Sequence, residues 1–148
     1  MIVIDTREQE PLAFERLTSV RGTLQTGDYS VAACRNLFSI ERKTVPDLVG
    51  CSMGKNLERF ERELHRLRVT GSNGCWWSGA RPRSWRASTT RTSNRRAVLD
   101  NVWAFEVRSD IPIVFVPTAQ AGARLVERWV FYFARETLAV VNDLWRAN

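Results

Sequence analysis

The sequence has 148 residues, of which 44% are apolar and 26% charged, and its formal net charge is +6. It contains no charge-free apolar run of membrane length, so a membrane protein is excluded and one globular domain over residues 1–148 is predicted. The three cysteines are odd in number and widely spaced, which argues against a disulfide framework or a zinc site. Because Met1 leads directly into an apolar segment, no signal peptide is expected, and we predict a cytoplasmic protein of prokaryotic or phage-like type.

Three short apolar segments in the first 41 residues predict a β-meander. The first, at residues 2–5, runs into the charged group Asp5, Arg7 and Glu8. The second covers residues 23–33, interrupted at Gly27, and after a turn the third covers residues 37–41. This arrangement would bring to one edge of a sheet the side chains of Asp5, Asp28, Glu41 and Lys43. Arg42 should point to the opposite face from Glu41 and Lys43.

Carboxylates and an ammonium at one sheet edge are typical of a metal-dependent phosphodiesterase. Mg²⁺ binds one or two carboxylates together with water and phosphate oxygens, and a nearby lysine can position the attacking water. The alternative is an ordinary hairpin whose charges are solvated.

The same residues carry a resemblance to a known family. The chain has Asp5-Thr6-Arg7-Glu8, then Gly27-Asp28-Tyr29, then Glu41-Arg42-Lys43 with Asp47 four residues after Lys43. These pieces, in this order, resemble the nuclease domain of the XPF family of structure-specific endonucleases. The similarity continues through residues 58–61 and again from Ala97 to about Asn142.

This resemblance implies an α/β fold of the restriction-endonuclease-like type, with a mixed central sheet flanked by helices. It also implies a DNA endonuclease that uses Mg²⁺ or Mn²⁺ and acts on forks, flaps or branched DNA in repair or recombination. Asp28 and Glu41 would hold the metal, and Asp5 would complete the carboxylate cluster around it or act through a water. Lys43 would handle the nucleophilic water. Supporting roles at phosphate or at neighbouring side chains would fall to Arg7, Glu8, Arg42 and Asp47. Many family members carry a tandem helix-hairpin-helix domain, which we do not expect here; the alternative function is an inactive DNA-binding or assembly module with the same fold.

Two helices are predicted after the third strand. Thr44 is a plausible N-cap for the first, and Asp47 could either orient Lys43 or cap that helix. The second has an apolar face formed by Leu57, Phe60, Leu64 and Leu67, with charged pairs such as Arg59 and Glu63 on the other face. The sole histidine, His65, falls on the charged face, so a histidine base is not expected.

Residues 71–94 differ in composition from the rest of the chain. Between Leu64 and Leu99 there are eight arginines and no acidic residue, whereas the remaining chain has 14 basic and 16 acidic residues. The tract could be a nucleic-acid-binding loop in which bases stack on tryptophan. It could also be a frame-displaced reading of the gene, because shifting the codons of Cys75, Trp76 and Trp77 by two bases forces Leu-Val. We favour frame displacement, which would restore a Leu-Leu-Val-Val strand; in the present chain we expect poor order there, with a short strand around Trp76 as the exception.

Regular periodicity returns after Arg96. We predict a helix at residues 98–107, a strand buried on both faces at residues 113–116, and a long helix at residues 119–145 capped by Thr118. The long helix has more apolar residues than one packing face needs. Its surplus is predicted to form a homodimer contact, with a buried core helix of a monomer as the alternative.

Overall fold

The computed structural model describes residues 1–51, 55–69, 72–78 and 92–147. Over these ranges the strands form one six-stranded sheet in the order β2-β1-β3-β4-β5-β6. The strands are β1 (Ile2–Asp5), β2 (Ser19–Gly22), β3 (Tyr29–Val31), β4 (Phe38–Thr44), β5 (Ser72–Ser78) and β6 (Ile113–Val116). β3 is antiparallel to both β1 and β4, and the other pairs are parallel. The sheet is therefore mixed, as predicted.

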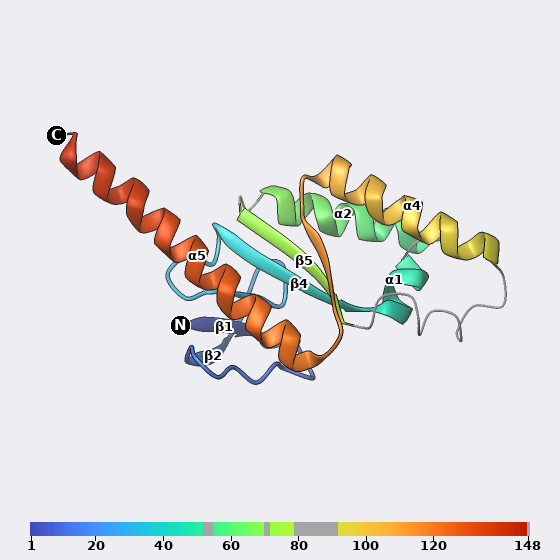
Figure 1. The fold of residues 1–148 in the computed structure, drawn as a ribbon, viewed down its shortest axis with the longest axis horizontal. Coiled ribbons are helices and arrows are strands. Elements are labelled where there is room, and N and C mark those ends of the chain that lie inside the picture. The colour runs from blue at the N-terminus through green and yellow to red at the C-terminus, as the bar shows by residue number, and fades with distance from the viewer. Residues whose placement is uncertain (52–54, 70–71, 79–91, 148) are drawn as a thin grey trace.

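Helices cover both faces of the sheet. Helices α1 (Val45–Cys51), α2 (Lys55–Val69) and α4 (Thr92–Ser109) lie on one face, and α5 (Ala119–Arg146) crosses the other before extending away from the sheet (Figure 1). Each face has its own apolar core. Phe60, Leu64, Val102 and Phe105 belong to the first core, and Ile4, Ile40, Val126 and Val130 to the second. These two cores confirm the α/β class, with the sheet between layers of helices.

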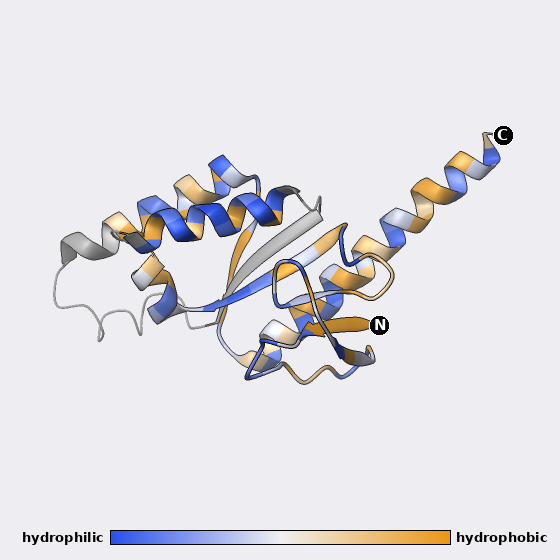
Figure 2. Ribbon diagram, turned by 180° about the vertical axis from the view of Figure 1, so that it is seen from behind, coloured by the Kyte–Doolittle hydropathy of each residue, from blue (hydrophilic) through white to orange (hydrophobic). Residues whose placement is uncertain are grey.

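Successive side chains of strand β4 point to opposite faces of the sheet. Phe38 and Ile40 pack into the core beneath α5, so Glu41 and Lys43 face α1 and α2. Figure 2 shows this strand changing from hydrophobic to hydrophilic towards the end that leads into α1. Arg42 lies on the opposite face from Glu41 and Lys43, as predicted.

The predicted meander is correct in its order but not in its strand boundaries. β1, β3 and β4 are neighbours as expected, but the strand predicted at residues 23–33 is confined to Tyr29–Val31. Gly27 has a positive φ of 77°, which turns the backbone just before that strand. β2 was not predicted, because its residues are largely exposed and lack an apolar alternation.

The C-terminal elements follow the prediction closely. α4 begins at Thr92 instead of residue 98 and ends before Asp110, whose φ is 52°. β6 has the predicted bounds, but Val114 and Phe115 are only half-buried because β6 is an edge strand. Thr118 caps α5 by accepting a hydrogen bond from the backbone nitrogen of Ala121 at 3.1 Å.

The unusual tract contributes one central strand. β5 (Ser72–Ser78), which contains Trp76, pairs in parallel with β4 on one side and with β6 on the other. Residues 79–91, which include all four of the tract's arginines, lie outside the described residues. No helix in the described part of the chain is long and apolar enough to cross a membrane.

Candidate active site

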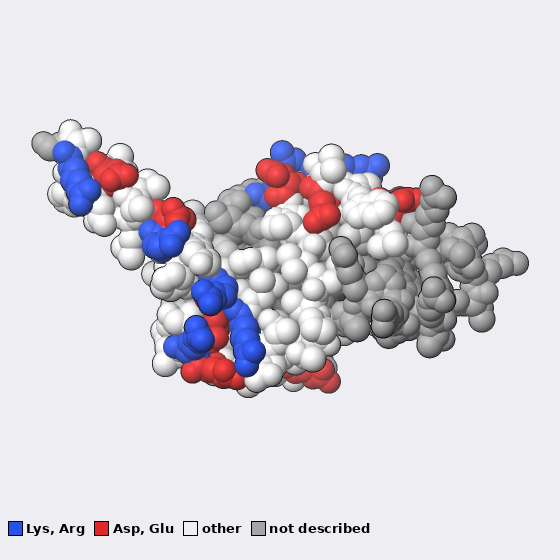
Figure 3. All heavy atoms as spheres, viewed as in Figure 1, with Lys and Arg blue, Asp and Glu red and all other residues white. Residues whose placement is uncertain are grey.

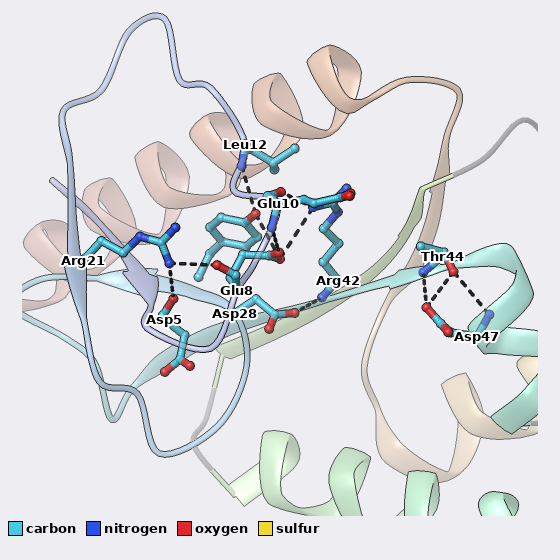
Figure 4. A network of polar contacts seen from close by, with 10 residues as sticks. Asp5, Glu8, Glu10, Leu12, Arg21, Asp28, Arg42, Thr44 and Asp47 are labelled. Carbon is cyan, nitrogen blue, oxygen red and sulfur yellow. Dashed lines mark hydrogen bonds and ion pairs between the residues drawn. The ribbon is translucent and has the colours of Figure 1, made fainter.

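Asp28 is held between the ends of β1 and β4 by its own backbone. Its nitrogen donates to the carbonyl of Ile40 at 2.8 Å, and its carbonyl accepts from the nitrogen of Asp5 at 2.8 Å. Its side-chain Oδ2 accepts a hydrogen bond from the backbone nitrogen of Arg42 at 2.7 Å (Figure 4). Asp28 is thus aligned with the strand segment that carries Glu41 and Lys43.

Gly27 makes this close approach possible. A Cβ at this position would lie 2.0 Å from Oγ of Ser39 and 3.0 Å from the carbonyl oxygen of Ile40. Ser39 cannot easily yield, because its hydroxyl donates to the carbonyl of Thr26 at 2.7 Å. The glycine before Asp28 is therefore required both for its positive φ and for lack of space.

Lys43 lies between two carboxylates from different elements. Its Nζ is 2.7 Å from Oε1 of Glu41 on the same strand and 3.1 Å from Oε2 of Glu63 on α2. The ring of Phe60, one turn before Glu63, lies 5.3 Å from the same ammonium. Because the Lys43 side chain is only 14% exposed, the ammonium is held in a defined place.

The carboxyl groups of Asp28 and Glu41 both have a raised pKa. Burial raises the pKa of Asp28 to about 6, with the charges of Glu8 and Glu63 acting in the same direction. Burial and the charge of Asp28 also hold the pKa of Glu41 well above its usual range. For Lys43, burial would lower the pKa, but the charges of Glu41 and Glu63 outweigh it and raise the pKa. A buried and a half-buried carboxylate, both of raised pKa, beside a charged lysine form a place where added positive charge would be stabilised.

Asp5 is close to the cluster, but its oxygens are already engaged. Oδ1 accepts from Nε and the backbone nitrogen of Arg7 at 2.6 and 2.9 Å, and Oδ2 accepts from the backbone nitrogen of Leu24 at 2.7 Å. Burial would raise the pKa of Asp5, but these hydrogen bonds together lower it. Asp5 therefore fixes the turn after β1. The Arg7 side chain is largely exposed, and it lies near enough to Asp28 and Glu41 for their charges to contribute to the raised pKa of Arg7.

Arg42 and Glu8 form a separate network on the other face of β4. The guanidinium of Arg42 donates to the carbonyl of Glu10 and lies 3.6 Å from the carboxylate of Glu8 (Figure 4). The buried hydroxyl of Tyr29 donates to Glu8 at 3.4 Å and accepts from the nitrogen of Leu12 at 3.2 Å. Arg42 and Glu8 thus connect β4 to the segment after β1.

Asp47 acts as a helix cap. Its backbone nitrogen donates to Oγ1 of Thr44 at 3.3 Å, and its carboxylate accepts from the backbone nitrogen of Thr44 at 3.4 Å and from the Thr44 hydroxyl at 2.6 Å. This reciprocal pair is a capping box at the start of α1. Of the two predicted roles for Asp47, the geometry supports capping.

The donor set fits a hard divalent cation with few protein ligands. No group of three or more His, Cys, Asp and Glu side chains in the described residues is arranged to hold a metal ion. Mg²⁺ needs only one or two carboxylates, because water and phosphate oxygens complete its octahedron. Asp28, which is half-buried, and Glu41, which is buried, both have a raised pKa and are the residues that could hold it.

Two residues around the site were not identified from sequence. The sequence pattern predicted Glu63 on the charged face of its helix. Glu63 follows the buried Phe60 by three residues, and side chains three residues apart are neighbours on a helix, so this spacing could have indicated a position beside the core. Arg21 donates to the carbonyls of Asp5 and Glu8 at 3.3 and 2.8 Å. It lies on the unpredicted β2, so no sequence pattern indicated this role.

Comparison with known proteins identifies the fold and the family of the chain. The fold is similar to "XPF from Aeropyrum pernix, complex with DNA", with a TM-score of 0.71 and 17% identity over 91% of this chain and 65% of that chain. A second structure, "XPF from Aeropyrum pernix", has a TM-score of 0.68 and 18% identity over 95% of this chain and 68% of that chain. The chain thus spans about two thirds of the solved proteins it resembles, and the predicted restriction-endonuclease-like fold is confirmed.

No curated protein sequence matches the chain. The family model described as the ERCC4 domain matches residues 4–128, and the chain therefore belongs to the ERCC4 domain family, the XPF-type nuclease domains.

Proposed function

We propose that this protein is a metal-dependent endonuclease that hydrolyses phosphodiester bonds in DNA. The observation that carries the proposal is the cluster of Asp28 and Glu41, both of raised pKa, beside Lys43 and within the residues that match the ERCC4 domain. Such a cluster costs stability unless positive charge is brought to it. An inactive module would have no reason to keep it.

Each residue of the site has a distinct role in this proposal. Asp28 and Glu41 would hold Mg²⁺ or Mn²⁺, and the chemistry that such an ion supplies is a more acidic water and neutralisation of charge on the phosphate. Lys43 orients the attacking water through its ammonium group. Asp5, whose two oxygens already accept hydrogen bonds, positions Arg7 and the Asp28 loop and would complete the carboxylate cluster through a water.

Arg7 is the best-placed residue to contact the scissile strand. Its side chain is 67% exposed, and its pKa is influenced by both Asp28 and Glu41. A guanidinium in that place can bind a phosphate next to the metal. That one of the similar solved structures is a DNA complex supports DNA as the substrate, and the family resemblance supports forks, flaps or other branched DNA.

A cleavage assay tests the proposal. Fork, flap and linear duplex DNA labelled at one end are incubated with the protein in Mg²⁺, Mn²⁺, Ca²⁺ or chelator. Cleavage of branched DNA in Mg²⁺ or Mn²⁺, lost in chelator and in Asp28→Asn, is expected. Binding of DNA without cleavage under every condition would support the inactive DNA-binding or assembly module instead.

We also propose that the far half of α5 pairs with a second copy of the chain. This part extends beyond the sheet (Figure 1) and exposes the side chains of Leu138, Val140, Val141, Leu144 and Trp145. Figure 3 shows charged side chains of both signs along α5 with uncharged ones between them. Sedimentation should give a dimer for the parent chain and a monomer for Leu144→Asp, and a monomeric parent would reject the pairing.

A further inference from the structure

We infer that Glu63 is a positioning residue that holds Lys43 in place when Glu41 is engaged by the metal. This inference rests on the proposed metal-dependent chemistry. It follows from the way in which two carboxylates share the Lys43 ammonium, one from β4 and one from α2.

Glu41 is required for two tasks at once. Its Oε1 accepts the hydrogen bond from Lys43 at 2.7 Å, and the same carboxylate is a proposed metal ligand. Lys43 and the cation are both positive, so they compete for this carboxylate, and binding of the cation weakens the hold of Glu41 on Lys43. An anchor outside the metal site is needed to keep the ammonium in position.

Glu63 has the geometry of that anchor. Its Oε2 is 3.1 Å from Nζ of Lys43, and the side chain is 25% exposed, so the ion pair is only partly screened by water. The backbone that carries it is fixed by the buried neighbours Phe60 and Leu64 on either side. Phe60 also presents its ring to the same ammonium at 5.3 Å, which adds a cation–π contact. Helix α2 therefore supplies two contacts to Lys43 that do not involve Glu41.

The chain is well suited to a direct test, because its only lysines are Lys43 and Lys55. In a Lys55→Arg background, lysine labelled with ¹³C at Cε gives a single side-chain NMR signal, that of Lys43. Without metal, Glu41→Gln removes the charge of the first anchor, and the Lys43 signal should keep the dispersed shift of an ordered side chain. Adding Glu63→Ala should move the signal to the shift of free lysine. The inference is overturned if Glu41→Gln alone releases Lys43, or if the double variant leaves the signal unchanged.

A cleavage cycle tests the consequence for catalysis. Glu63→Ala should lower kcat about tenfold to a hundredfold with little change in the affinity for DNA measured in Ca²⁺. Glu63→Gln should recover most of the loss, since its amide oxygen can still accept from Lys43. In a Lys43→Ala background, Glu63→Ala should cause no further loss, because it acts through that lysine. A further loss of similar size would show a merely structural role for Glu63. If the parent chain does not cleave at all, the proposed function fails while the NMR result still decides the anchoring role.

Discussion

The Oδ2 atom of Asp28 accepts a hydrogen bond from the backbone nitrogen of Arg42 at 2.7 Å. The contact joins the Gly-Asp-Tyr turn to the Glu-Arg-Lys strand across 14 residues of sequence. It uses a main-chain donor, so its geometry is set by β4 itself and not by the rotamer of Arg42. Two sequence motifs are thereby combined into one site.

The first prediction concerns the three central side chains. Asp28→Asn, Glu41→Gln and Lys43→Ala should each lower cleavage by at least about a hundredfold, because each removes a proposed metal ligand or the charge that handles the water. Single-turnover cleavage of fork DNA is the measurement. Near-normal turnover in any one variant would remove that residue from the catalytic assignment. Arg42→Ala is the matched comparison, since its side chain lies on the other face of β4; it should lose affinity for DNA more than rate.

The second prediction concerns stability without metal. The pKa of Asp28 is about 6 in the folded protein against an ordinary 3.8, so between these values the folded state binds more protons than the unfolded state. Stability should therefore fall as the pH rises through this window, by on the order of 2–3 kcal/mol, with Glu41 acting in the same direction.

Urea unfolding in chelator at about pH 4 and about pH 7 measures this dependence. Mg²⁺ should raise the midpoint more at the higher pH, where the carboxylates are ionised. Asp28→Asn should flatten the profile and be more stable than the parent at the higher pH. A parent whose stability rises with pH over this range would contradict the raised pKa.

The third prediction concerns the turn that carries Asp28. Gly27→Ala should lower the free energy of unfolding by more than about 2 kcal/mol, because the left-handed conformation alone costs roughly 1–2 kcal/mol and the new Cβ would lie 2.0 Å from Ser39. Gly50→Ala on α1 is the control, since among the described residues no atom outside its chain neighbours and its own helix backbone lies within 4 Å of the added Cβ; it should be neutral or up to about 1 kcal/mol stabilising. Equal effects at the two glycines would show that the turn tolerates a side chain.

Sequence patterns were sufficient for the parts of the site that depend on strand alternation. The spacing of Glu41, Arg42 and Lys43 on one strand correctly separated Arg42 from the other two. The apolar face of Phe60, Leu64 and Leu67 likewise gave the buried side of α2.

Contacts between distant elements could not be obtained in this way. The backbone nitrogen of Leu24 donates a hydrogen bond to Oδ2 of Asp5. This contact depends on how the segment before Gly27 bends, and no periodic sequence pattern predicts that bend. The ion pair of Glu63 with Lys43 depends on how α2 lies across β4. A charged residue on a predicted helix could face water equally well, so its partner emerged only with the packing.

The fourth prediction concerns the arginine-rich tract, which lies largely outside the described residues. Replacing Arg81, Arg83, Arg86 and Arg91 by serine should weaken non-specific DNA binding and reduce its salt dependence, by up to about 3–4 units in the slope of log K against log salt. The cleavage position on branched DNA should not change. A shift in which structure is cut would favour the binding-loop interpretation of residues 71–94 over frame displacement.

The last prediction concerns the composition of β5. This strand lies between β4 and β6 in a parallel arrangement, where long runs of branched apolar residues are usual, yet its sequence includes Ser72, Asn73 and Gly74. Restoring Leu-Leu-Val-Val by the displaced frame should add one or two buried side chains, at roughly 1.5–3 kcal/mol each. Since Cys75, Trp76 and Trp77 are already apolar, we expect a net gain of about 2–6 kcal/mol and a higher urea midpoint.

A variant restored only at residues 79–94 separates the strand from the tract after it and should show little of the gain. Equal midpoints for the present chain and the version restored at residues 72–78 would show that the strand is suited to its position as written, and would count against frame displacement.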